Sequence, residues 1–107
     1  MSFECSEHLH YKLLHLTGEV DLSNSSEVRT CLLDILNNGH SVVVNFSDLD
    51  YIDSSGIATL VEGLNIAKKS NLELLIVAAN GAPKQVLELT RLDQVFTLID
   101  SIDEITE

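Results

Sequence analysis

Basic residues are scarce in this chain of 107 residues. Six lysines and arginines stand against 17 aspartates and glutamates, which gives a formal net charge of -11. Such a surface repels the phosphates of nucleic acids and of anionic lipids, so we expect no nucleic acid as a partner. A basic protein, or a basic patch on one, fits this charge better, because complementary fields speed encounter.

Cysteine and long apolar runs are also scarce. Cys5 and Cys31 are the only cysteines and form no C-x-x-C pair, which favours a reduced, cytoplasmic chain. Because the four histidines are scattered, we expect no metal site, and we expect no other cofactor. The first seven residues contain neither a basic stretch nor an apolar run, and no uncharged apolar stretch is long enough to span a membrane. We therefore expect no secretion signal and no direct membrane insertion.

Common catalytic and nucleotide-binding motifs are missing as well. The segment Ile52-Asp53-Ser54-Ser55-Gly56 lacks the first glycine of a G-x-S-x-G elbow. No Walker loop and no G-x-G-x-x-G sequence occurs. We expect a binding protein without catalytic residues, and an enzyme or nucleotide binder that uses Asp21 and Asp53 stays open as an alternative.

Hydrophobic residues make up 45% of the chain, enough at this length for one packed core and too few for two, so we expect a single domain over residues 1–107. Apolar spacing alternates between strand-like and helix-like. It predicts strands at 3–7, 11–17, 41–46, 72–77 and 95–99, and helices at 23–36, from Ser54 to about Lys69, from Pro83, and at 100–105.

This order predicts an α/β fold. We expect a mixed β-sheet of four to five strands, with about four helices packed mainly on one side. Segment 41–46 is nearly all apolar and β-branched, which is typical of a central strand covered on both faces. Gly18 should end the strand before it, and the polar residues 47–51 should form a connection.

Asp53, Ser54, Ser55 and Gly56 place a carboxylate and two hydroxyls where the buried strand leads into the second helix. The first turn of a helix has unpaired N–H groups and the positive end of the dipole, so a phosphate bound or formed there is stabilised. The simpler alternative is a helix cap, because Asp and Ser are preferred N-cap residues. Gly56 costs about 1 kcal/mol relative to alanine inside a helix, which suggests close approach by another group.

A second carboxylate, Asp21, follows the strand at 11–17. If this strand and the one at 41–46 are parallel neighbours, their ends lie at one edge of the sheet and bring Asp21 near Asp53. Paired carboxylates can position a serine hydroxyl, or a magnesium ion that arrives with a nucleotide. An ordinary loop is the alternative.

Four segments together resemble a STAS domain of the anti-sigma factor antagonist type. They are L-T-G-E-V-D at 16–21, V-V-V-N-F at 42–46, D-S-S-G-I at 53–57 and L-E-L-T-R-L-D-Q-V-F-T-L-I-D-S-I-D-E-I at 87–105. The segments occur in the family's order and span nearly the whole chain. Two departures are Ile57-Ala58-Thr59, where Leu-Gly is common, and Arg91, where glycine is frequent.

The resemblance implies a phosphorylation-controlled binding switch. Ser54 matches the phosphoacceptor, and Asp21, Asp53, Ser55, Gly56 and Ile57 match its neighbours and the partner-binding surface. The unphosphorylated form would bind a serine kinase of the GHKL type that is also the anti-sigma factor, and phosphorylation would release it. A PP2C-type phosphatase would restore the binding form, and the kinase rather than this chain would bind ATP and magnesium.

The resemblance leaves two other functions open. STAS domains also act as accessory subunits of phospholipid-transporting ABC systems, in which a threonine often follows the aspartate. Partner-switching regulators that do not act on a sigma factor are a further possibility. Ser54 directly after Asp53 favours the phosphorylation switch.

Overall fold

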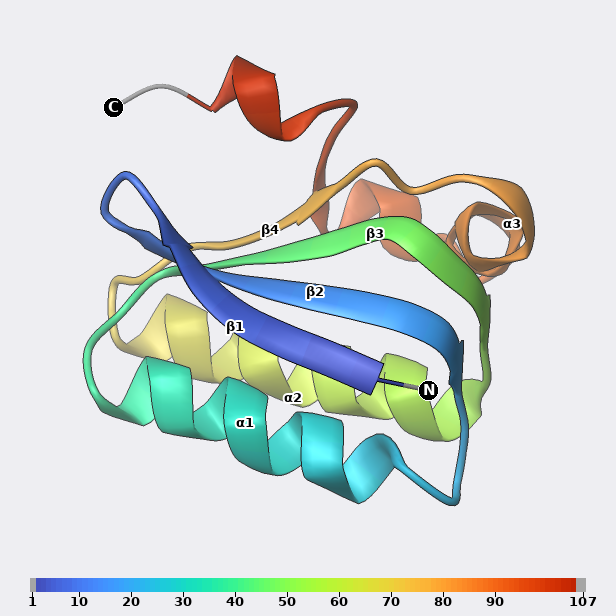
Figure 1. The fold of residues 1–107 in the computed structure, drawn as a ribbon, viewed down its shortest axis with the longest axis horizontal. Helices are drawn as coiled ribbons and strands as arrows, with labels where there is room; N and C mark the ends of the chain where they lie inside the picture. Colours follow the sequence, from blue (N-terminus) through green and yellow to red (C-terminus); the bar gives the residue numbers. More distant parts are fainter. Residues whose placement is uncertain (1, 106–107) are drawn as a thin grey trace.

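The computed structural model describes residues 2–105 (Figure 1). Met1, Thr106 and Glu107, which the expected domain includes, lie outside the described residues. Within this range, five strands form one sheet in the order β1-β2-β3-β4-β5, and only β1 is antiparallel to its neighbour. The strands are β1 (Ser2–His8), β2 (Tyr11–Val20), β3 (Val42–Ile52), β4 (Leu74–Val77) and β5 (Thr97–Ile99). The predicted mixed α/β sheet is therefore confirmed.

Helices α1 (Ser25–Asn37) and α2 (Ser54–Lys69) lie side by side on one face of the sheet, as predicted (Figure 1). Their inner residues, including Leu32 and Leu60, are almost fully buried against the sheet. Helix α3 (Gly81–Leu89) packs beside β3 and adds Leu87 to the same core. Within residues 2–105, no helix combines the length and the apolar character that a bilayer crossing needs.

The opposite face of the sheet is covered in part by the C-terminal segment (Figure 1). Ile105 packs there with Tyr11, Val43 and Leu75, and with Val77 of β4. Strand β3 is thus covered on both faces at its start, where the side chains at positions 42, 43 and 44 have no exposed surface. This confirms the prediction of a buried central strand.

Strands β2 and β3 are longer than predicted, because they stay paired through register shifts. Gly18 does not end β2: it has φ of +73° at a shift in the ladder, and pairing continues to Val20. Residues 47–51 belong to β3 rather than to a connection. The shifts let Leu49 and Ile52 point into the core while the polar residues face solvent, which a strict two-residue alternation does not reveal.

The C-terminal third differs from the prediction in two details. Helix α3 begins at Gly81, so Pro83 occupies the third helical position and not the first. The expected fourth helix is a 3-10 turn, Ile102–Glu104, whose N-cap is Ser101. The Ser101 hydroxyl accepts the N–H of Asp103, and the Glu104 carboxylate accepts the N–H of Ser101. This capping box therefore begins a single 3-10 turn and not an α-helix.

Candidate functional site

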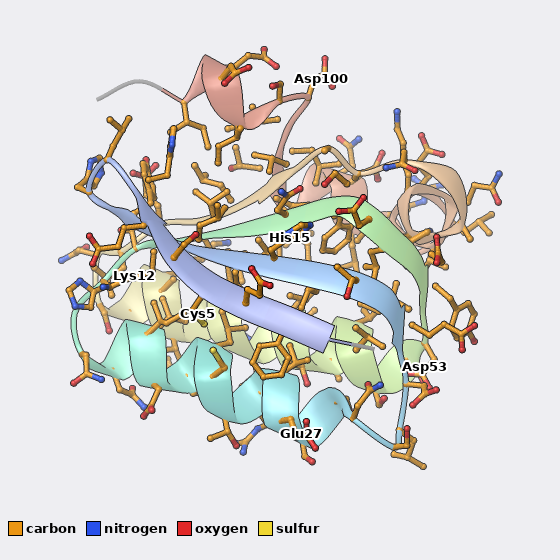
Figure 2. All side chains as sticks on the ribbon, viewed as in Figure 1. Cys5, Lys12, His15, Glu27, Asp53 and Asp100 are labelled. Atoms are coloured by element: carbon orange, nitrogen blue, oxygen red, sulfur yellow. The ribbon has the colours of Figure 1, made fainter. Side chains whose placement is uncertain are left out.

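Asp53 caps helix α2, and its carboxylate is engaged by the residues that follow it (Figure 2 labels Asp53). One oxygen, Oδ1, accepts the backbone N–H of Ser55 at 2.9 Å and that of Gly56 at 3.3 Å. The Ser55 hydroxyl donates to the same oxygen at 2.6 Å. The cap alternative is therefore right for Asp53, whose carboxylate satisfies N–H groups that the first helical turn leaves unpaired, while the Ser55 hydroxyl only donates to that carboxylate.

Ser54 takes no part in this cap. It is the first residue of α2 and is exposed. Its hydroxyl makes no hydrogen bond to any other group within residues 2–105, in contrast to the Ser55 hydroxyl beside it. Of the two serines, Ser54 is the one whose oxygen is accessible to another molecule.

Asp21 and Asp53 come together at one edge of the sheet, as predicted from the parallel pairing. Val20 is the register partner of Ile52, and the N–H of Asp53 donates to the Val20 carbonyl at 3.0 Å. Each carboxylate is bonded within its own loop: Asp21 Oδ1 accepts the N–H and the hydroxyl of Ser23 at 2.9 and 2.6 Å. Among the described residues, no group of three or more metal-ligating side chains is clustered.

The hydrogen bonds around Asp53 favour its charged form. The Ser55 hydroxyl contributes most to lowering the pKa of Asp53 below its ordinary value, and desolvation opposes this in part. The backbone N–H groups of Gly56, Ser55 and Leu22 lower the pKa further. Because Leu22 belongs to the loop after β2, the Asp53 carboxylate lies near that loop as well as at the start of α2.

Gly56 is explained by packing inside the protein. A Cβ atom at this position would lie 2.6 Å from Cγ1 of Ile52 and 2.9 Å from Cγ1 of Val20, and both side chains are buried. The close approach that the glycine suggested is therefore made by the chain's own core. Gly56 brings the first turn of α2 against the ends of β2 and β3, and in this way fixes where Ser54 lies.

A shallow groove of about 500 Å³ begins beside Ser54. Tyr51, Ile57, Val86 and Thr90 line it, so α3 forms one wall and the first turn of α2 the other. Tyr51 is 45% exposed, and Ile57 of the predicted surface is half-buried at the groove. No sequence pattern indicates that α3 takes part, because its approach to α2 depends on tertiary packing.

Leu22 is a site residue that the sequence reasoning missed. It is 81% exposed, at the middle of the loop that carries Asp21 and Ser23. The signal was present, because Asp21-Leu22-Ser23 repeats the D-x-S pattern of Asp53-Ser54-Ser55 and makes the same two hydrogen bonds. Leu22 and Ser54 occupy the equivalent middle positions of these two D-x-S segments, one in the loop after β2 and one at the start of α2.

Arg91 adopts a backbone conformation that favours glycine. Its φ is +62°, in the left-handed region at the turn between α3 and the 3-10 helix Leu92–Gln94. Glycine adopts this conformation without the steric cost that a side chain adds. A glycine at this position would therefore suit the backbone better than the arginine does.

Comparisons with known proteins identify the family and the fold of this chain. The family model of the STAS domain matches residues 2–105. A Thermotoga maritima protein named "putative anti-sigma factor antagonist" is 29% identical over 91 residues, which cover 83% of this chain and 80% of the relative. A crystal structure of an anti-sigma factor antagonist described in the same terms, also from T. maritima, has a TM-score of 0.89 at 26% identity and covers 95% of this chain and 89% of that one.

SpoIIAA of Bacillus has the same fold at lower identity. The structure of its phosphorylated form has a TM-score of 0.77 at 16% identity, covering 96% of this chain and 95% of that one. Its unphosphorylated form, an anti-sigma factor antagonist, gives the same TM-score and identity, covering 96% and 92%. At this identity the likeness shows the shared fold.

Proposed function

This chain belongs to the STAS domain family, and we propose that it is an anti-sigma factor antagonist whose partner binding is controlled by phosphorylation of Ser54. In this proposal residues 1–107 act as one cytoplasmic STAS domain, a binding module and not an enzyme. The unphosphorylated form binds a GHKL-type serine kinase that is also the anti-sigma factor. A PP2C-type phosphatase removes the phosphate and restores binding.

The exposed, unbonded hydroxyl of Ser54 is the observation that carries this proposal. A kinase needs a serine oxygen that it can reach without opening the fold. Ser55 is disfavoured, because its hydroxyl donates to Asp53 at 2.6 Å as part of the cap. The names of similar proteins motivate the proposal: the T. maritima relatives carry the antagonist name. SpoIIAA, which shares the fold, has been solved in its phosphorylated and unphosphorylated forms.

The surface around Ser54 suits a protein partner. Leu22, in the loop after β2, and Tyr51, in the groove beside Ser54, both expose large side chains, and the groove offers further apolar area through Ile57 and Val86. Exposed apolar groups that gather at one place, with charged groups around them, are typical of protein contact surfaces. The carboxylates of Asp21 and Asp53 add negative charge, which fits a partner with a basic patch.

Phosphorylation of Ser54 would change this surface strongly. It adds nearly two negative charges beside two carboxylates. The N–H groups of Ser55 and Gly56 already donate to Asp53, so they are not free to receive the phosphate. The new charge therefore stays directed outward at the edge of the groove, where it repels a partner.

Phosphosite mapping in the source organism tests the acceptor. Tagged chains are expressed in place of the native one, and the phosphopeptides are located by fragmentation mass spectrometry. We expect phosphate in the wild type and in Ser55→Ala, and none in Ser54→Ala. The matched control is Ser26→Ala, because Ser26 is also an exposed serine in the first turn of a helix. Unchanged phosphorylation of Ser54→Ala would show that another residue is the acceptor.

Capture experiments test the switch itself. Ser54→Ala, which stays unmodified, should retain a GHKL-type kinase, and Ser54→Asp, which places a permanent charge there, should lose it. Ser26→Ala and Ser26→Asp should both retain it. Equal capture of the kinase by both Ser54 variants would contradict control by phosphorylation, and capture of an ABC transporter ATPase instead would favour the transport-accessory function.

A further inference from the structure

Cys5 and Cys31 are in contact although 26 positions separate them in the sequence. Their Sγ atoms lie 2.8 Å apart, with Cys5 on the edge strand β1 and Cys31 on α1 (Figure 2 labels Cys5). Both thiols are free. We propose that these two cysteines form a reversible dithiol–disulfide site that is oxidised by hydrogen peroxide, a modification that is independent of the phosphorylation of Ser54.

The backbone elements hold the two sulfurs against each other. Phe3 and Cys5 are two residues apart on β1 and so share one face of the strand, and Phe3 packs against the core beneath the sheet. Cys31 packs against the same core from α1. A disulfide has an S–S length of about 2.05 Å, so bond formation requires the sulfurs to approach by only about 0.8 Å.

The two thiols differ in access, and this difference gives each a separate role. Cys5 is exposed, at a hollow of about 530 Å³ whose walls include Lys12, Asp34 and His40. Cys31 is only partly exposed, and burial, together with its contact to Cys5 and the charge of Asp34, raises the pKa of its thiol to about 12. Peroxide therefore reaches Cys5 first, while Cys31 stays protonated beside it.

The reaction proceeds in two balanced steps. The thiolate of Cys5 attacks one oxygen of hydrogen peroxide and breaks the O–O bond, which yields a sulfenic acid on Cys5 and, with the thiol proton, one water. The sulfur of Cys31 then attacks the Cys5 sulfur, and the departing hydroxide takes the Cys31 proton as a second water. Two electrons pass from the two sulfurs to the peroxide, and a dithiol reductant reverses the change.

The disulfide would tie β1 to the middle of α1. In the reduced protein β1 is bonded to the sheet on one side only, through its pairing with β2. Closing a loop of this length restricts the unfolded chain, which is expected to raise the thermal midpoint by about 10 °C. A reversible bond of this kind is compatible with a reducing compartment, where disulfides are usually transient and regulatory.

Peptide mapping of the full chain after peroxide treatment tests the proposal. Trypsin places Cys5 in the peptide 1–12 and Cys31 in the peptide 30–68. We expect an intact mass lower by about 2 Da, a non-reduced link between these two peptides, and a raised thermal midpoint, all reversed by dithiothreitol. Two free thiols remaining after treatment, or links only between different molecules, would overturn the proposal.

Single variants test the separate roles. Cys31→Ser should leave a sulfenic acid on Cys5 that dimedone traps, and Cys5→Ser should give neither a dimedone adduct nor a disulfide. Because Cys5 is exposed, Cys5→Ser is expected to fold normally, and it also serves as the control for the thermal midpoint. A dimedone adduct on Cys31 in the Cys5→Ser variant, at the wild-type rate, would show that the assigned order of attack is wrong.

Discussion

Replacing Gly56 by alanine should destabilise the protein, although Gly56 lies inside a helix. In α2 an added Cβ atom would lie 2.6 and 2.9 Å from Cγ1 and Cδ1 of Ile52, and 2.9 Å from Cγ1 of Val20. Contacts below 3 Å force atoms to move. Ile52 and Val20 are both 1% exposed and β-branched, so neither side chain can rotate away freely.

The size of the effect follows from two opposing contributions. Overpacking a close-packed core costs about 1–3 kcal/mol. Alanine gains about 1 kcal/mol over glycine from its higher helix propensity. Three contacts below 3 Å place the steric cost in the upper part of its range, about 2–3 kcal/mol, so we expect Gly56→Ala to lower the free energy of unfolding by about 1–2 kcal/mol.

Urea denaturation followed by circular dichroism measures this difference directly. The matched control is Ala58→Gly, an exposed position two residues further along the same helix, which isolates the propensity contribution and should cost about 1 kcal/mol. If Gly56→Ala proves as stable as the wild type or more stable, the packing argument is refuted. In that case the first turn of α2 would not be fixed by its contact with Val20 and Ile52.

Three further predictions concern Asp53, Arg91 and Leu22. Replacing Asp53 by Asn should lower the free energy of unfolding at pH 7, because the folded state lowers the pKa of Asp53 and so stabilises its charged form. This difference from the wild type should persist above about pH 4 and shrink as the pH falls through the folded-state pKa. Urea denaturation between pH 7 and pH 3 measures the difference. Arg91→Gly should raise the free energy of unfolding by about 0.5–1 kcal/mol, because a left-handed cost of about 1–2 kcal/mol exceeds the entropy that glycine loses on folding; an unchanged or lower denaturation midpoint would contradict this. Leu22→Ala should weaken kinase binding by about fivefold or more in a titration while leaving the thermal midpoint unchanged, whereas Leu9→Ala, at an exposed leucine of the β1–β2 hairpin, should change neither.

How far the sequence predicts the fold depends on whether the signal is local. The run at 42–44 and the D-S-S-G segment are local signals, and they correctly place the central strand and the start of α2. The extension of β3 through 47–52 could not be read in the same way, because it depends on register shifts against β2. The contact between Cys5 and Cys31 depends on how α1 packs under β1, and their spacing in the sequence carries no sign of it.

The same distinction applies to the candidate site. Its two carboxylates were placed correctly, since parallel pairing brings the residues after Val20 and Ile52 to one edge. Its apolar part was missed, because exposure of Leu22 follows from the shape of its loop and not from its residue type. Because leucines are mostly buried, a leucine in a sequence is predicted to lie in the core. For Leu22, only the repeated D-x-S pattern indicates an exposed position.

The division of roles between Asp53 and Ser54 explains how such a site can be switched without unfolding. Asp53 satisfies the N–H groups of Ser55 and Gly56, so the start of α2 needs nothing from the Ser54 hydroxyl. A phosphate on Ser54 would therefore alter the charge and shape of the surface while the cap stays intact. If the cap depended on Ser54, phosphorylation would destabilise α2 as well as the contact surface. Equal urea midpoints for Ser54→Ala and the wild type, beside a clear loss in Asp53→Ala, are the result that this division of roles requires.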